Sequence, residues 1–509
     1  MKKLNFNESV KIVKNKLRKY KCISIINNLI ILLDKSSNSN DKIESLKYFP
    51  WIVCLLVKIV LEDELIHINT GKECPQEVVI ECVNLIWSAQ SIENSSSDDP
   101  GVAYRSLRSL LQGQLIFQTG ESWNFLRWPA LVSDLPKNHP CYIFFIDRFG
   151  VDPERFMEIL TILHEPVLKN KLWIELKYFS PIINKIREDF IRVLNEFSRD
   201  VYQLRKELIK RKKENNLREK PPYEMNEQPW LMKYPIFKFS EEVLRIWHPD
   251  VFCQGMEVNV HRRLSEIGGG YSQEFGKVFE KYVVKQLKDA NIEYLSEDDY
   301  WTVVGKNNNA MEAIVSDGNT NILIDAKLTV YSEYAAIHTE YALAWQSLKR
   351  VREAINQGWN VSEKLSQINN EWICTKAKEN YLFVITSQQF FCCTGEHLRR
   401  IFKSDVFDPN KNSQRKQKTP TNAQLNILPV SNIVIMSIDE WEQLIKLVEN
   451  GVINIFDFSR KVVEANKDSL TSVMVVSQIL EKISTNRYLS KTVLEAKNKV
   501  LNDVKKYFT

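Results

Sequence analysis

The sequence predicts a multidomain protein with a mostly α-helical N-terminal half, an α/β domain after it and a helical C-terminus. Apolar residues recur at helical spacing through most of residues 1–220. Short runs of β-branched and aliphatic residues, bounded by turn residues, lie between residues 300 and 438. From Asp439 onward the pattern is helical again. The length of 509 residues allows two to four domains.

The composition is that of an ordinary globular protein. Hydrophobic residues make up 44% and charged residues 26%, and a net charge of +5 is mild, so any basic surface for nucleic acid must be local. The nine cysteines include no CxxC pair, which favours reduced cysteines and a cytoplasmic location. No signal peptide is predicted, and the longest apolar run, 49–61, contains Lys58 and is shorter than the ~20 residues of a bilayer span. We therefore expect no membrane association.

Residues 1–220 form the predicted helical N-terminal region, with an internal break at 91–101. The break is a polar loop rich in serine, asparagine and aspartate. One long helix is expected from Ile182 to Lys213, because its apolar residues fall on one face. The basic end of this helix could contact phosphates, but a solvated helix end that complements the helix dipole is the favoured interpretation. The region is a candidate for sensing a target or binding a partner.

Residues 221–270 predict an aromatic-rich connector. Trp230, Tyr234 and Trp247 make this segment too aromatic for a free linker, so we expect it to dock the N-terminal half onto the next domain. The run 268–270 consists of three glycines but lacks the GxxxxGK[ST] pattern of a phosphate loop. A hinge before a helix explains it better.

A helix over about 272–288 places a carboxylate on an apolar stripe. Glu280 shares a face with Gly276, Val284 and Leu287. The glycine one turn away predicts a close approach of this helix to a sheet. A buried carboxylate needs a partner, which can be a metal ion or a nearby lysine or arginine. A first strand is then expected at Tyr300–Val304.

The next stretch, 309–327, predicts a β-hairpin. Two short apolar strands flank the turn residues 316–320, whose Asp-Gly-Asn tolerates positive φ. Within this turn Asp317 is interpreted as a turn residue and not as a site residue. A turn centred between Gly318 and Asn319 pairs positions whose numbers add up to 637.

This register brings two carboxylates together. The numbers of Glu312 and Asp325 add up to 637, so their side chains should face each other, and strand alternation puts Lys327 on the same face. Two carboxylates this close repel each other unless a cation lies between them or one is protonated. The sequence therefore predicts a divalent metal site at the end of an apolar strand.

The hairpin, with Asp325-Ala326-Lys327 ending its second strand, resembles the PD-(D/E)XK nuclease superfamily over roughly residues 270–440. In that family a glutamate on the preceding helix completes the site, and Glu280 matches it. Glu312 stands where the family usually has aspartate, and it follows Met311 in place of proline. The resemblance implies a restriction-endonuclease-like core at 271–440, a mixed sheet flanked by helices, with a helical segment 441–509 packed on it.

The function that the resemblance implies is metal-dependent hydrolysis of phosphodiester bonds. Glu280, Glu312 and Asp325 would hold Mg²⁺, with Mn²⁺ as a substitute, and Lys327 would orient or activate the attacking water. A DNA endonuclease of restriction or anti-phage defence type is the first expectation. An RNase and a non-catalytic nucleic-acid-binding or scaffolding protein remain open as alternatives. A separate partner protein or trigger could act through the N-terminal region, and oligomerisation is left open.

Candidate contacts to nucleic acid follow the hairpin. A long helix is expected from about Ser332 to Gln357. RecB-like members of the family carry Gln-x-x-x-Tyr on this helix. Gln346 matches its glutamine, whereas Arg350 stands where the tyrosine would be, and a surface polar residue explains Gln346 equally well. The remaining candidates are basic residues of this helix and of a predicted basic loop at 404–422: Lys349, Arg350, Arg415, Lys416 and Lys418. A plain solvated loop explains the last three nearly as well. Buried-type strands at 381–386 and 433–438 would extend the sheet.

Overall fold

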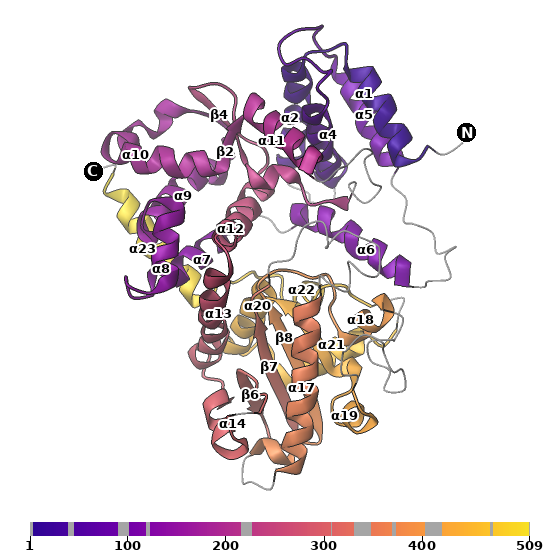
Figure 1. Cartoon of the computed structure of the whole chain (residues 1–509), viewed down its shortest axis with the longest axis vertical. Helices are drawn as coiled ribbons and strands as arrows, with labels where there is room; N and C mark the ends of the chain where they lie inside the picture. Colours follow the sequence, from indigo (N-terminus) through magenta and orange to yellow (C-terminus); the bar gives the residue numbers. More distant parts are fainter. Residues whose placement is uncertain are drawn as a thin grey trace. The chain divides into compact units, whose positions relative to one another are not determined.

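The computed structural model describes residues 4–38, 45–89, 101–118, 123–214, 226–306, 308–329, 348–368, 373–402, 420–468 and 472–507. Within these ranges the chain forms twenty α-helices and two mixed β-sheets, of four and five strands (Figure 1). The predominance of helix and the mixed sheet in the C-terminal half are confirmed. A second sheet in the N-terminal half was not expected.

The chain divides into two compact units, neither of which is one continuous segment. Unit 1 comprises Met1–Ile92, Ser109–Ile267 and Thr492–Thr509, and unit 2 comprises Glu93–Arg108 and Gly268–Lys491. Helix α6 (Gly101–Gln114) therefore begins in unit 2 and ends in unit 1.

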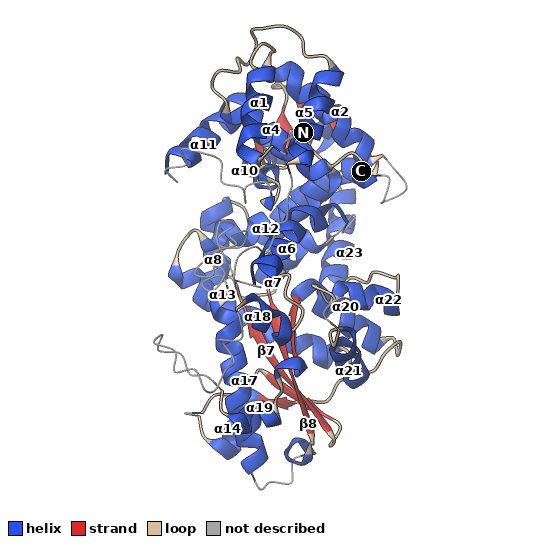
Figure 2. Ribbon diagram, turned by 90° about the vertical axis from the view of Figure 1, so that its right-hand side faces the viewer, coloured by secondary structure: helices blue, strands red, loops and turns tan. Residues whose placement is uncertain are grey.

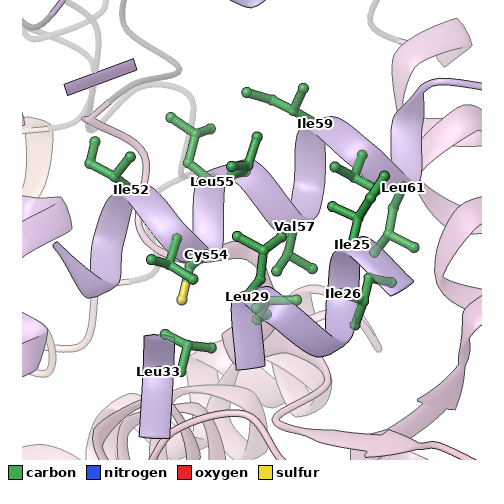
Figure 3. Close-up of a cluster of buried hydrophobic side chains, with 14 of the residues drawn as sticks. Ile25, Ile26, Leu29, Leu33, Ile52, Cys54, Leu55, Val57, Ile59 and Leu61 are labelled. Atoms are coloured by element: carbon green, nitrogen blue, oxygen red, sulfur yellow. The ribbon is translucent and has the colours of Figure 1, made fainter. Parts of the chain in front are cut away.

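Unit 1 begins with four helices that enclose one apolar core: α1 (Phe6–Leu17), α2 (Cys22–Ser37), α4 (Pro50–Glu62) and α5 (Gln76–Ser88). Helix α4 is buried along its whole length, as expected for a helix that is apolar on every side. Its Cys54, Val57 and Leu61 point toward α2, whereas Leu55 and Ile59 point the other way (Figure 3). In the described residues no helix is both long and apolar enough to cross a bilayer.

The rest of unit 1 combines helices with the smaller sheet. The helices are α7 (Arg127–Ser133), α8 (Pro140–Phe149), α9 (Pro153–Leu168), α10 (Ser180–Phe197), α11 (Val201–Glu214), α12 (Pro249–Ser265) and α23 (Lys491–Lys505). The strands are β1 (Trp173–Glu175), β2 (Ser198–Asp200), β3 (Ile236–Lys238) and β4 (Val243–Ile246), in the order β1-β4-β3-β2. Strand β2 is parallel to β3, and the other pairs are antiparallel.

Two expectations for unit 1 are wrong. The single helix from Ile182 to Lys213 is interrupted, because Ser198–Asp200 pairs with β3 and separates α10 from α11. The expected connector is not a connector in its described part, 226–267, since these residues supply β3, β4 and α12 to unit 1. Its aromatic residues form the core: Trp247 is fully buried and donates from its indole nitrogen to the Tyr234 carbonyl at 3.1 Å.

Unit 2 is built around the five-stranded sheet, in the order β5-β6-β7-β8-β9. The strands are β5 (Leu295–Ser296), β6 (Ala313–Ser316), β7 (Thr320–Lys327), β8 (Glu379–Thr386) and β9 (Ile433–Ser437). Strands β5, β6 and β7 are antiparallel, and β8 and β9 continue the sheet parallel to β7.

Helices cover both faces of this sheet. They are α13 (Gly269–Asp289), α14 (Glu297–Val304), α17 (Lys349–Gln367), α18 (Gly395–Ile401), α19 (Asn422–Ile427), α20 (Ile438–Glu449), α21 (Ile455–Ala465) and α22 (Ser477–Ile483). Figure 2 shows α17 on one side of the sheet and α20 and α21 on the other. The sheet is thus mixed and flanked by helices, as expected.

Three details of unit 2 differ from expectation. The strand expected at Tyr300–Val304 is the helix α14, which Ser296 and Asp299 begin with a capping box. Helix α17 ends at Gln367 and not near Gln357, and its expected beginning lies outside the described residues. The expectation that all of 441–509 packs on the α/β domain is wrong for Thr492–Thr509, which belongs to unit 1.

Candidate functional site

The β6–β7 hairpin has the register that the sequence predicts. Ala313 lies opposite Ile324, and Ser316 lies opposite Asn321. The turn residue Asp317 accepts hydrogen bonds from the backbone nitrogens of Asn319 at 2.9 Å and Thr320 at 2.7 Å, which confirms its role in the turn. The strand pairing ends at Ala313 and Ile324, and its extension by one position would put Glu312 opposite Asp325.

Asp325, Glu312 and Lys327 form a charged cluster at the end of β7. Lys327 Nζ donates to Asp325 Oδ1 at 2.7 Å and lies 4.0 Å from Glu312 Oε1. Glu312 Oε2 accepts a hydrogen bond from the backbone nitrogen of Ala326 at 3.1 Å, which fixes this carboxylate beside β7. The Asp325 side chain is fully buried, whereas those of Glu312 and Lys327 are 13% and 17% exposed.

One oxygen of this cluster has no hydrogen-bond donor. Among the described residues, no group donates to Asp325 Oδ2, although the atom is buried. A buried carboxylate oxygen without a donor is costly. A bound cation, or a proton shared with the neighbouring Glu312, would satisfy it.

The electrostatics of the cluster disfavour two ionised carboxylates side by side. Burial raises the pKa of Glu312 well above its usual range, and the charge of Asp325 raises it further. Burial disfavours the Lys327 ammonium, but the carboxylates of Asp325 and Glu312 outweigh this effect and raise the pKa of Lys327. Lys327 is therefore a cation in the metal-free protein. A divalent cation would let both carboxylates stay ionised.

Glu280 approaches this cluster from helix α13, which contacts β7. Burial raises the pKa of Glu280, Lys327 lowers it and Asp325 raises it, so the three groups are close enough to interact. The close helix–sheet approach expected at Gly276 is wrong, because a Cβ atom there would meet nothing within 4 Å. Helix α13 is held at Tyr282 instead, whose hydroxyl bonds Glu442 and lies 3.0 Å from Ser490 Oγ.

The acids fit a cation that keeps part of its water shell. In the described parts of the chain, no three His, Cys, Asp or Glu side chains are close enough to bind one metal ion directly. Glu312 and Asp325 face each other, and Glu280 would have to reach a shared ion through water. Carboxylate oxygens are the ligands that Mg²⁺ prefers, and Mg²⁺ usually binds one or two carboxylates and retains several waters.

The candidate nucleic-acid contacts are only partly described. Gln346, Arg415, Lys416 and Lys418 lie outside the described residues. Lys349 and Arg350 begin helix α17 with side chains that are 70% and 66% exposed. Both pair with Glu353, at 3.8 Å and 3.2 Å, and neither is brought into the acid cluster by these contacts.

Arginines of the basic helix α11 form hydrogen bonds and an ion pair within unit 1. Arg205 donates to the carbonyls of Leu61 at 3.2 Å and Ile66 at 2.8 Å, near the C-terminus of α4. Arg211 pairs with Glu227. Two arginines of this helix are therefore not simply solvated, as the favoured interpretation expected, but bond other parts of unit 1.

Glu297, the first residue of α14, was missed by sequence reasoning. Burial raises its pKa, and the charges of Glu280 and Asp298 raise it further, so Glu297 belongs to the same electrostatic neighbourhood. The acidic run 297–299 was the available signal. It was hidden because the segment after it was interpreted as a strand and not as a capped helix.

Comparison of the chain with protein-family models, with curated proteins and with solved structures gave no match. Function is therefore inferred from the geometry of the acid cluster and from the motif that it carries.

Proposed function

We propose that the protein is a Mg²⁺-dependent nuclease of the PD-(D/E)XK type that hydrolyses phosphodiester bonds, with DNA as the preferred substrate. The observation that carries the proposal is the fully buried Asp325, which faces Glu312 and leaves Oδ2 without a donor in the described chain. The mixed sheet and its hairpin, preceded by a helix with a carboxylate, support the same assignment.

Each polar side chain of the cluster has a distinct role in this proposal. Glu312 and Asp325 bind the cation, and Glu280 holds one of its waters. Bound Mg²⁺ supplies Lewis acidity and lowers the pKa of a coordinated water. The buried run 322–324 keeps these groups on a rigid strand.

Lys327 acts as a positive charge and not as a base. Its ammonium neutralises Asp325 and Glu312 while no metal is bound. With a divalent cation bound to the two carboxylates, Lys327 Nζ would be free to orient the attacking water. It can also stabilise negative charge that builds up on the phosphate.

The proposal is tested with linear, circular, single-stranded and modified DNA, and with RNA of matched sequence, each with and without Mg²⁺. We expect Asp325→Asn and Lys327→Met each to lower the cleavage rate by at least about 10²-fold, because the first removes a ligand of the cation and the second a positive charge beside the reacting phosphate. Asp317→Asn is the matched control, since it changes a carboxylate of the same hairpin but keeps the turn acceptor. Unchanged cleavage by Asp325→Asn would refute the proposal, and a preference for RNA would correct the substrate.

A non-catalytic nucleic-acid-binding module is the second candidate. One observation favours it: the described acids do not form a three-ligand group. Calorimetric titration with Mg²⁺ and Mn²⁺ separates the two candidates. A wild-type protein that binds neither ion but binds DNA would support the non-catalytic function.

A further inference from the structure

Glu297 follows directly after β5, the strand that pairs with β6. In the β5–β6 pair, Ser296 lies opposite Ala313, and Ala313 lies opposite Ile324 of β7. The row beyond these pairs consists of Glu297, which begins α14, Glu312, which precedes β6, and Asp325 of β7.

The start of α14 presents Glu297 and not its two acidic neighbours to the cluster. The Asp299 carboxylate is used in the helix cap, where it accepts from the Ser296 nitrogen at 3.2 Å and from Ser296 Oγ at 2.6 Å. Asp298 is exposed, whereas Glu297 is partly buried. Tyr300, which is 1% exposed, anchors the helix in the same apolar core as Leu323 of β7.

The charges of this row and of Glu280 are not balanced by the cations beside them. In the described part of the chain, Lys327 is the ammonium that contacts these four carboxyl groups: it bonds Asp325 and lies near Glu312. Lys277, the other lysine that acts on Glu280, donates to Glu274 at 2.9 Å. Independently of this count, Asp325 Oδ2 is buried in the same row without a donor in the described chain.

We infer that Glu297 is a fourth acid of the cation site, and that Glu297 and Glu280 bind the water shell of a cation seated on Glu312 and Asp325. The absence of a three-ligand group among the described residues places the two outer acids beyond direct coordination. Water-mediated contacts suit Mg²⁺, which gives up its waters reluctantly. Outer partners of this kind tune the affinity for the metal. The inference rests on the proposed function, because it assumes that the inner pair binds a divalent cation.

The test is a calorimetric titration of the full chain with Mg²⁺ and with Mn²⁺. We expect Glu297→Gln to weaken the Kd about 10-fold, the lower end for loss of an outer partner. Asp298→Asn is the matched control: it removes the same charge one residue away, on an exposed side chain, and should change the Kd by no more than about 2-fold, since exposed charges are screened by salt.

Thermal unfolding in EDTA separates a cation-binding role from a structural one. Glu297→Gln should unfold at the wild-type temperature or above, because it removes repulsion within the acid cluster. Added Mg²⁺ should also raise the unfolding temperature of this variant less than it raises that of the wild type.

Three outcomes overturn the inference, and they are distinguishable. Equal Kd values for Glu297→Gln and Asp298→Asn overturn it and leave the proposed function intact. Weaker binding together with a lower unfolding temperature in EDTA assigns Glu297 a structural role instead. Absence of Mg²⁺ and Mn²⁺ binding to the wild type, with the same result for Asp325→Asn, overturns the proposed function and the inference with it.

Discussion

Glu312 occupies a position that suits an uncharged carboxyl group, or a carboxylate next to a cation. Its side chain is 13% exposed and lies near Asp325, and both burial and that neighbour raise its pKa above the usual 4.5. The folded protein therefore binds this proton more tightly than the unfolded chain does. Without a divalent cation, stability must fall as the pH rises from about 4.5 through the folded-state pKa.

Glu312→Gln should flatten this pH dependence. The amide keeps an acceptor for the Ala326 nitrogen but does not titrate. In the wild type, the free energy of unfolding falls by about 1.4 kcal/mol for each pKa unit by which folding raises the pKa of Glu312, and the variant should not show this fall. Thermal unfolding in EDTA between pH 5 and pH 8 measures the effect. The exposed Glu293→Gln serves as the control, and an equally steep loss of stability in Glu312→Gln would contradict the assignment.

At the residue scale, the sequence predicts those residue positions that follow from the register of a short turn. The Asp-Gly-Asn turn sets the register, and the register places Glu312 and Asp325 without further information. Glu297 was not predictable in the same way, because the strand before it, β5, has two residues and no periodicity to detect. Whether Asp325 Oδ2 has a donor depends on every surrounding side chain, so its lack of one among the described residues can be seen only in the structure.

At the element scale, the sequence predicts helices and strands whose ends depend on neighbouring residues, but not those that depend on residues distant in the chain. Helix α9 begins as expected, because Asp152 caps it through the Arg155 nitrogen and Pro153 follows. The break between α10 and α11 has no such signal, since β2 exists only by pairing with β3, which comes later in the chain. Helix α14 had a local signal, the Ser296–Asp299 capping box, that the strand-like composition of Tyr300–Val304 obscured.

Glu227 anchors the segment before β3 to two helices of unit 1. Lys58 of α4 and Arg211 of α11 both pair with its carboxylate. The side chains of Lys58 and Glu227 are 4% and 6% exposed. Lys58 also lies 3.9 Å from Glu62. This buried ion network explains why the segment belongs to the core of unit 1.

Glu227→Ala should destabilise unit 1 by about 3–5 kcal/mol, because it leaves the Lys58 ammonium buried without its closest partner. Urea unfolding followed by tryptophan fluorescence measures the loss. The double variant Lys58→Met/Glu227→Gln should recover part of it, since it removes both the buried ammonium and the carboxylate that faces it. A double variant that is no more stable than Glu227→Ala would show that packing, and not charge, dominates at this position.

At the scale of the whole molecule, the composition of the two units cannot be predicted from the order of segments in the sequence. Unit 1 is completed by residues 492–509, where the Tyr507 hydroxyl donates to Glu158 at 2.7 Å and Lys497 lies over the Trp123 ring at 4.7 Å. Apolar periodicity shows that 491–505 is helical but not which core it joins. The resemblance to a nuclease covers most of unit 2 and none of unit 1.

All four acids of the proposed site lie in unit 2, so the effect of a bound cation should be local. A ligand at 100 times its Kd stabilises the state that binds it by about 2.7 kcal/mol. Hydrogen exchange with added Mg²⁺ should therefore slow in peptides from α13, the start of α14 and the β6–β7 hairpin. Peptides from α2 and α4 serve as the internal reference and should exchange at the same rate with and without Mg²⁺.

The variant Asp325→Asn tests whether this protection comes from a cation bound at the acid cluster. The variant should lose the Mg²⁺ effect in the unit 2 peptides, because it removes half of the inner carboxylate pair. Protection that persists in this variant would place the cation elsewhere in the chain. Protection of α2 and α4 that disappears in the variant would instead show that occupancy of the acid cluster stabilises unit 1 as well, which is the coupling that a sensing N-terminal region requires.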